Sequence, residues 1–447
     1  MGREWDGILK VCVEGEVRMS RRLFSSLASG RWGKVLVVAL TLVVLSYVGL
    51  GYLMGMTGED KTYRSLSVFS EVLQHIQQDY VEEPNLPLVT SGALHGLLES
   101  LDPLSSYLSP REYTEYKQKV QNGSKGEVGL SLSKRFGYII VVAVLPDSPA
   151  QKAGLRPGDI LEAISGFTTR EMSVGQAQIL LAGDAGRGVK VFVVRRGRSE
   201  TQEMDLVREH VSMPKVTAEK VEPEVGYLRL VTLEAGKANE IREKLAQFEK
   251  QGIQKLVLDL RDNAKGDPNE AVAVARLFLP AGTIGSLKGQ TVAREEFVAE
   301  PAKVVWKHPI TVLINSSTSG AAEVLAAAIG ENKRGEVVGT RTYGSASEQK
   351  LFPLDDGAAL VLTVALYYTP SGKAIPDEGV KPTVEVRAGS DELDADDDSP
   401  GAPQPGVRPA SPEDPVLRKP IEILKGGAAK AMRVVPVRKA RRLPEAA

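Results

Sequence analysis

The segment ITVLINSSTSGAAEVLAAAIG, from Ile310 to Gly330, is the stretch that decides the fold. Ile310–Ile314 is an apolar run that predicts a strand, and Ala321–Gly330 is predicted to form a helix. The turn between them is rich in small polar residues, which commonly begin helices. A strand followed at once by a helix predicts an α/β domain.

The same alternation of strands and helices continues on both sides of this segment. Strands are predicted at Gly226–Val231, Lys255–Leu260 and Val337–Gly339, and helices at Asn239–Gln251 and Asn269–Phe278. Alternation of this kind argues for an α/β sandwich, in which helices cover a sheet.

The chain upstream has a different apolar pattern, which repeats every second residue. Strands are expected at Gly129–Ser133 and Tyr138–Leu145, followed by a short helix and tight turn within DSPAQKAGLRPGDILEAISG (Asp147–Gly166). A helix at Val174–Leu181 and a strand at Lys190–Arg195 complete this unit. Helical periodicity precedes it, with helices expected at Ser65–Tyr80, Leu88–Leu101 and Glu112–Val120.

Val35–Met56, VLVVALTLVVLSYVGLGYLMGM, is the only long apolar run. No charge interrupts it, and it is long enough to cross a bilayer core, which takes about 20 residues. Basic residues precede the run and Glu59 and Asp60 follow it, so the positive-inside rule places the N-terminus in the cytoplasm. We expect a single-pass protein of the bacterial inner membrane, with everything after Thr57 on the periplasmic, extracytoplasmic side. A cleaved signal peptide is the alternative.

These patterns, together with a shift to acidic and then Pro-rich composition that cannot build a core, divide the chain into segments. The predicted segments are a cytoplasmic N-terminus (1–34), a transmembrane anchor (35–56), a helical section (64–122), a strand-rich domain (123–208), an α/β domain (215–387), a disordered linker (388–413), and a short helix at about Pro415–Leu424 with a basic tail (414–447).

The overall composition excludes several classes of function. Acidic residues number 57 and basic residues 56, so the net charge gives no indication of nucleic acid binding. The single cysteine, Cys12, allows no internal disulfide. The four histidines are scattered and none has metal-ligand spacing, so neither a metal site nor a cofactor is expected.

The strand-rich domain resembles a PDZ domain, which has a β-sandwich-like α+β fold. The resemblance rests on Gly129-Leu130-Ser131-Leu132 and the later SPAQKAGLRPGD. It implies that a peptide C-terminus adds as a strand beside Gly129–Ser133, while backbone N–H groups of the preceding loop receive its carboxylate. Leu130 would line the pocket for the terminal residue, and Leu132 and the helix Val174–Leu181 would complete the groove. A glycine is usual where Ser131 stands, and serine is tolerable there if φ stays negative. A PDZ fold kept only for packing or regulation is the alternative.

The exported chain, from about Ser65 to Val386, resembles the carboxyl-terminal processing, or tail-specific, peptidases. The segments that carry this resemblance, in chain order, are DYVEE (Asp79–Glu83), LDPLSSYLSPREY (Leu101–Tyr113), VLDLRDN (Val257–Asn263), EAVAVARLFLPAGTIGS (Glu270–Ser286) and LTVALYYTPSGKAIPDEGVKP (Leu362–Pro382). The resemblance implies a nucleophilic serine at a strand–helix turn, a lysine on a later strand that takes its proton, and a glutamine that orients the lysine. A serine hydroxyl is a poor nucleophile without such a base.

Two of these three residues are absent from this chain. The nucleophile pattern, small-Ser-small-small-Glu, falls on NSSTSGAAE and places Gly320 at the nucleophile position. The pattern aromatic-Gly-Lys-Gly-x-x-Gln falls on YGSASEQ, which places Ser345 at the base position and keeps Gln349. The interval between Gly320 and Ser345 matches that of the family. The Asn-Pro-Gly-Gly loop that supplies an oxyanion N–H in the family is here Asn263-Ala264-Lys265-Gly266, with Lys265 replacing the first glycine.

We therefore expect a degenerate, inactive member that binds polypeptide C-termini or unfolded protein without cutting them. One alternative is an active serine endopeptidase with Ser319 as a relocated nucleophile and Lys265 as its base. Another is a regulatory subunit or adaptor of an active paralogue, and active relatives suggest a homo- or hetero-oligomer by analogy. The simplest interpretation of the turn is that Ser319 or Thr318 caps the helix and Glu323 supports it.

Overall fold

The structure is a computed structural model that describes residues 35, 38–48, 60–122, 126–135, 137–170, 172–195, 200–376, 378–387 and 414–426. The chain divides into two compact units, Met1–Val89 and Thr90–Ala447. In the first unit, residues 38–48 are helical, and α3 spans Asp60–Asp79. α4 (Leu86–Glu99) begins in the first unit and ends in the second.

The predicted anchor, Val35–Met56, lies only partly within the described residues. Among those residues, none of the helices has both the length and the apolar character needed to span a bilayer. The anchor therefore stays a prediction.

The strand-rich domain is built on a six-stranded sheet with the order β2-β3-β4-β6-β7, in which β5 pairs with β4. Its elements are β2 (Leu130–Arg135), β3 (Tyr138–Val144), α6 (Pro149–Lys152), β4 (Ile160–Ile164), β5 (Phe167–Thr168), α7 (Val174–Leu181), β6 (Gly188–Val194) and β7 (Thr201–Val207). Side chains from β2, β3, β4, β6 and α7 form its core. Because β2 is at the edge of this sheet, one side of its backbone is free of a partner strand among the described residues.

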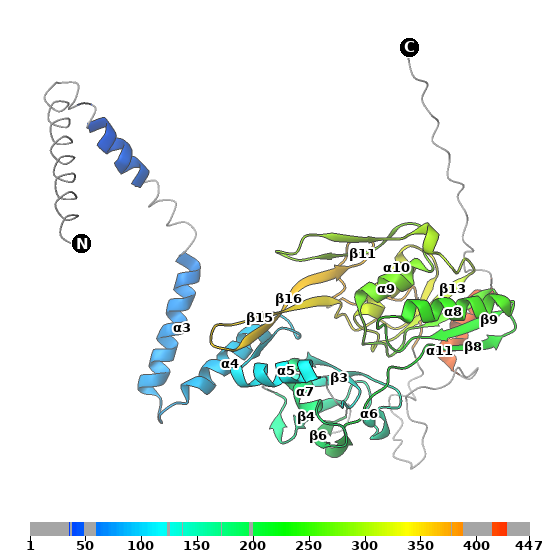
Figure 1. Ribbon diagram of the computed structural model, residues 1–447, viewed down its shortest axis with the longest axis horizontal. Coiled ribbons are helices and arrows are strands. Elements are labelled where there is room, and N and C mark those ends of the chain that lie inside the picture. The colour runs from blue at the N-terminus through cyan, green and yellow to red at the C-terminus, as the bar shows by residue number, and fades with distance from the viewer. Residues whose placement is uncertain are drawn as a thin grey trace, which may run out of the picture. The chain divides into compact units, whose positions relative to one another are not determined.

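The α/β domain is built on a second six-stranded sheet with the order β17-β14-β13-β10-β9-β8. Its strands are β8 (Thr217–Glu222), β9 (Val225–Arg229), β10 (Lys255–Asp259), β13 (Ile310–Ile314), β14 (Glu336–Gly339) and β17 (Val384–Glu385). All neighbours are parallel except β8, which runs antiparallel to β9. The helices α8 (Lys237–Lys250), α9 (Pro268–Arg276) and α10 (Ala321–Glu331) pack with this sheet in one large apolar core (Figure 1).

Helix α11 (Pro415–Lys425) belongs to this α/β domain, although the sequence indicated only a short helix in the tail. Its buried residues Val416, Leu417 and Leu424 pack against a separate cluster that includes Val257 and Leu313 of β10 and β13. The carboxylate of Asp414 caps the helix and lies 2.9 Å from the Arg261 guanidinium. The C-terminal helix therefore covers a second apolar surface of the sheet.

A third, five-stranded sheet was not predicted from the sequence. Its strands are β1 (Ser106–Leu108), β11 (Thr283–Lys288), β12 (Glu295–Val298), β15 (Ser347–Pro353) and β16 (Ala359–Tyr368), and all of its pairs are antiparallel. β1 lies between α4 and α5 (Pro110–Asn122), so its pairing with β16 joins the helical section to the α/β domain. A short 3-10 helix spans Pro301–Lys303.

Candidate peptidase-like site

Three loops meet at the carboxyl edge of the parallel sheet, where open α/β sheets usually bind their ligands. They follow the adjacent strands β10, β13 and β14. The N–H of Ser319 donates to the carbonyl of Asn263 at 2.8 Å, and the N–H of Tyr343 donates to the carbonyl of Thr318 at 2.9 Å. These bonds bring the three sequence-predicted segments, 263–266, 315–323 and 343–349, together in one site.

Gly320, the predicted nucleophile position, is the N-cap residue of α10 and has φ 63° and ψ −121°. This backbone conformation is one that side-chain-bearing residues rarely adopt. A sharp, strained turn between a strand and a helix is the arrangement that exposes the nucleophile in α/β-hydrolases. Apart from Gly320 and its two chain neighbours, no described residue has an atom within 4 Å of the point where a Cβ would stand. The turn thus has open space at this position but presents no functional group.

Glu323 fastens this turn to the loop after β14. One of its carboxylate oxygens accepts from the N–H groups of Gly320 and Ser345, both at 2.9 Å. The other accepts from the Thr342 hydroxyl at 2.5 Å and the Gly344 N–H at 2.6 Å. Glu323 is fully buried, and this burial raises its pKa despite the four donors. The predicted supporting role of Glu323 is confirmed and extends across two loops.

The predicted capping role of Ser319 or Thr318 is wrong, because Gly320 occupies the N-cap position and makes no side-chain cap. The Thr318 hydroxyl donates instead to the carbonyl of Leu260 at 2.9 Å. The Ser319 Oγ lies 2.6 Å from the Ser345 Oγ, and its residue is buried. Within the described part of the chain, no lysine nitrogen is hydrogen-bonded to Ser319. The Gly320 N–H donates to the Glu323 carboxylate, and the backbone N–H of Glu323, which a side-chain cap would accept from, donates to the Gly320 carbonyl at 3.0 Å.

Lys265, the alternative base, makes its ion pairs elsewhere. Its ammonium lies 3.5 Å from a carboxylate oxygen of Glu127 and 3.8 Å from one of Glu234. The loop backbone at Lys265 and Gly266 pairs with Leu233, whose N–H donates to the Lys265 carbonyl at 2.9 Å. The loop is therefore held beside the site, while the ammonium group of Lys265 contacts the carboxylates of Glu127 and Glu234.

Gln349 is exposed and is not hydrogen-bonded to Ser345. Its side-chain amide donates to the Ser347 hydroxyl at 2.8 Å and to the Thr363 hydroxyl at 3.5 Å. Among the described residues, no group of three or more His, Cys, Asp and Glu side chains is placed to hold a metal ion. The site thus joins Ser319, Gly320 and Ser345 but leaves Gln349 at its margin.

The predicted peptide groove begins at Gly129, whose φ is 79°. A Cβ at this position would lie 2.3 Å from the Cβ of Ser148, so glycine is required there. Leu130 is half-buried, Leu132 is buried in the domain core, and Ser131 has no positive φ. These residues lead into the free edge of β2, to which a peptide strand can add.

The far end of β2 contacts the peptidase-like site. The guanidinium of Arg135 lies 4.5 Å from the centre of the Tyr343 ring, and its Nη2 donates to the Tyr343 carbonyl at 3.4 Å. Stacking of this kind is favourable because the ring face is electron-rich. The end of β2 and the loop that bears Ser345 are therefore in direct contact.

The fold and this cluster define a serine-peptidase-type α/β core with a PDZ-like domain attached. A model of peptidase family S41 matches residues 224–386, and a PDZ domain model matches residues 140–195. The chain is 31% identical over 335 residues to the carboxy-terminal-processing protease of Bartonella bacilliformis, covering 73% of this chain and 76% of that protein. It is 33% identical over 315 residues to the carboxyl-terminal-processing protease of Synechocystis, covering 69% and 73%.

Among solved structures, the photosystem II D1 C-terminal processing protease matches with a TM-score of 0.60 and 28% identity, covering 72% of this chain and 92% of that one. The protein therefore belongs to the carboxyl-terminal processing protease family of S41 peptidases, as the sequence motifs indicated.

Proposed function

We propose that this protein is a membrane-anchored relative of the carboxyl-terminal processing proteases that binds polypeptide C-termini without cutting them. One observation carries the proposal. Gly320, at the nucleophile position, has no side chain, and Ser345, at the base position, has a hydroxyl in place of an amine. A covalent route needs a nucleophile and a base within hydrogen-bond reach of each other.

The neighbouring groups offer poor substitutes for this pair. Ser319 and Ser345 are hydrogen-bonded hydroxyls, and neither is a base that could deprotonate the other. Each oxygen of Glu323 already accepts two hydrogen bonds, so this carboxylate is engaged in holding the loops. Without nucleophile and base, only the weak rate enhancement that binding itself provides is left.

Binding of C-termini is supported by the PDZ domain. Edge strand β2 leaves a row of backbone groups for an added strand, and the positive φ of Gly129 shapes the loop that precedes it.

The proposed location, at the inner membrane with the PDZ and peptidase-like domains outside the cytoplasm, is supported by the charges that flank Val35–Met56. Fusions of alkaline phosphatase and of green fluorescent protein to the C-terminus test it, since we expect only the phosphatase to be active.

The binding proposal is tested with the full-length protein in detergent and a labelled unfolded protein that ends in apolar residues. We expect saturable binding by fluorescence anisotropy and no new termini by mass spectrometry. The same polypeptide with an amidated C-terminus is the matched control, and it should bind much more weakly because the loop receives a carboxylate.

A working serine endopeptidase is the second candidate, favoured by the buried Ser319 hydroxyl beside the base position. Cleavage by the unmodified protein that disappears in Ser319→Ala would establish it and refute the inactive assignment. If full-length protein purified from cells retains an active paralogue, the role of regulatory subunit or adaptor gains support.

A further inference from the structure

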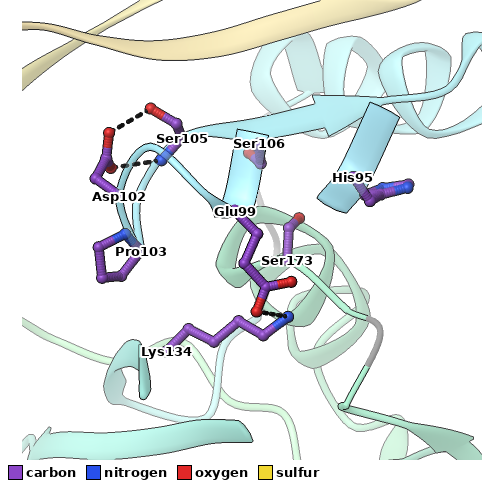
Figure 2. A pocket seen from close by; sticks show the side chains of 8 residues that line it. All are labelled: His95, Glu99, Asp102, Pro103, Ser105, Ser106, Lys134 and Ser173. Carbon is purple, nitrogen blue, oxygen red and sulfur yellow. Dashed lines mark hydrogen bonds and ion pairs between the residues drawn. The ribbon is translucent and has the colours of Figure 1, made fainter. Parts of the chain in front are cut away.

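A small polar pocket lies at the end of the groove between β2 and α7 (Figure 2). It is lined by His95 and Glu99 of α4, Ser106 of β1, Lys134 of β2, and Ser173, the N-cap residue of α7. Lys134 is near the last residue of β2 and Ser173 precedes the first residue of α7. The pocket is therefore at the opposite end of β2 from Gly129 and Leu130, where the peptide carboxylate is expected.

Lys134 is a buried charge in this pocket. Its side chain is 6% exposed, and its ammonium lies 3.0 Å from a carboxylate oxygen of Glu99, whose own side chain is 42% exposed. Leu132, two positions earlier on the strand, is buried against α7, so strand alternation directs Lys134 to the same face. Glu99 comes from α4, outside the PDZ domain, and is its ion-pair partner among the described residues.

The pocket has little room for anything besides this ion pair. Its volume is about 10 Å³, which is roughly the space that one water molecule needs. The Nε2 atom of His95 is buried and has no hydrogen-bond partner among the described residues. A second carboxylate does not fit beside Glu99 but can take its place.

We propose that Glu99 stands in for an acidic side chain of the bound polypeptide, and that the groove selects C-termini carrying Asp or Glu shortly before the last residue. This inference rests on the proposed binding of C-termini. An added strand runs antiparallel to β2 and pairs with it residue by residue, so the acidic residue lies about two to four residues before the end. It displaces the half-exposed Glu99, and Lys134 keeps a carboxylate partner throughout.

The physical reason for selection is the buried ammonium. A ligand side chain that enters the pocket expels Glu99, and a neutral side chain then leaves Lys134 buried without an opposite charge, which is strongly unfavourable. A ligand carboxylate replaces Glu99 as the ion-pair partner of Lys134, so its entry has little net cost. We therefore expect peptides with Glu at this position to bind at least about tenfold more tightly than the matching peptides with Gln there.

The test uses the full-length protein and fluorescein-labelled peptides with an apolar C-terminal residue. One Glu is placed two, three or four residues before the end, and each peptide has a Gln-containing twin. The expected preference for Glu is lost in Lys134→Met, which keeps the aliphatic stem but removes the charge. In Glu99→Gln there is no ion pair to break, so acidic peptides should bind several-fold more tightly, the Gln peptides should lose their penalty and also bind more tightly, and the preference for Glu should persist because only Glu restores an opposite charge to Lys134.

Each outcome separates this inference from the proposed function. Equal affinities for Glu and Gln peptides, or a preference that survives Lys134→Met, overturn the acidic selection while carboxylate-dependent binding of the Gln peptides upholds the function. If no peptide binds, or amidated peptides bind equally well, both fail. Carboxylate-dependent binding of the Gln peptides by Lys134→Met, at least as tight as that of the unmodified protein, shows that this variant is folded.

Discussion

The hydroxyl oxygens of Ser319 and Ser345 lie 2.6 Å apart and join the turn before α10 to the loop after β14. The contact is a bond between two neutral groups, each of which can donate or accept. Ser345 is also held by its backbone N–H, which donates to Glu323. The side-chain contact between these two positions is therefore one that can fasten two loops but cannot transfer a proton to a base.

This contact should be measurable as a coupling energy. Ser319→Ala leaves the Ser345 hydroxyl without its partner, and Ser345→Ala does the reverse, so each should lower the free energy of unfolding by about 0.5–1.5 kcal/mol. The loss in free energy of unfolding in the double variant should be smaller than the sum of the losses in the two single variants, because the same hydrogen bond is removed in each. Urea unfolding of the four proteins measures this, and strictly additive effects would show that the two hydroxyls do not interact in solution.

Glu323→Gln should destabilise the protein although it changes little in volume. Four donors converge on the carboxylate, and an amide nitrogen in place of either oxygen would face two of them. We expect a loss of about 1–3 kcal/mol in the free energy of unfolding. Glu249→Gln, at an exposed position of α8, is the control and should stay within about 0.5 kcal/mol of the unmodified protein. Equal effects of the two substitutions would contradict the supporting role of Glu323.

The sequence predicted the parallel sheet well because its strands are short apolar runs separated by clear helices. The β13 strand has the predicted bounds Ile310–Ile314, and α7 has the predicted bounds Val174–Leu181. The resemblance to the peptidase family also implied that these loops contribute to one site. The Ser319–Ser345 contact was missed, because spacing along a helix gives no information on what an adjacent loop brings to it.

The third sheet and the role of α11 lay beyond sequence reasoning for a different reason. β15 carries Glu348 and Lys350 and is largely exposed, so its pattern does not mark a buried face. Its pairing with β16, and that of β1 with β16, depends on contacts between distant segments. α11 is preceded by an acidic and Pro-rich stretch, and composition alone gives no sign that a helix after such a stretch returns to the core.

Asp259 should make the protein more stable at neutral pH than in acid. Burial alone would raise its pKa, but the Arg261 guanidinium, 2.6 Å away, and the Tyr227 hydroxyl hold the pKa below its ordinary value of 3.8. A lowered pKa in the folded state contributes stability above pH 3.8, and this contribution is lost as the pH falls below that value. Asp259→Asn should cost about 3 kcal/mol at pH 7, since it leaves a buried guanidinium poorly paired.

The check is urea unfolding of both proteins between pH 7 and pH 3. The difference in free energy of unfolding between the unmodified protein and Asp259→Asn should be constant at neutral pH and should become smaller below pH 3.8. A difference that widens in acid would mean that Asp259 is protonated in the folded protein.

Helix α11 should contribute to the stability of the α/β domain. Leu417 is 1% exposed and packs in the cluster with Val257 and Leu313. Leu417→Ala should therefore lower the free energy of unfolding by about 2–4 kcal/mol, from lost burial and from the cavity left behind. Lys419→Ala, on the exposed side of the same helix, should have almost no effect. If the two variants have equal stability, α11 does not pack on the sheet in solution.

Restoring both missing groups tests whether the site differs from a working one by those groups alone. Serine at position 320 meets no steric obstacle, although its positive φ costs about 1–2 kcal/mol of backbone strain. Lysine at position 345 starts from a half-buried loop residue that already touches the turn through Ser319. The variant Gly320→Ser, Ser345→Lys should cut a labelled unfolded protein, whereas either single variant should not, because nucleophile and base are useless apart. Gly320→Ala combined with Ser345→Lys is the matched control for the added hydroxyl. A double variant that folds but stays inactive would show that the Lys265 loop or the position of Gln349, which is exposed and not bonded to Ser345, also prevents catalysis.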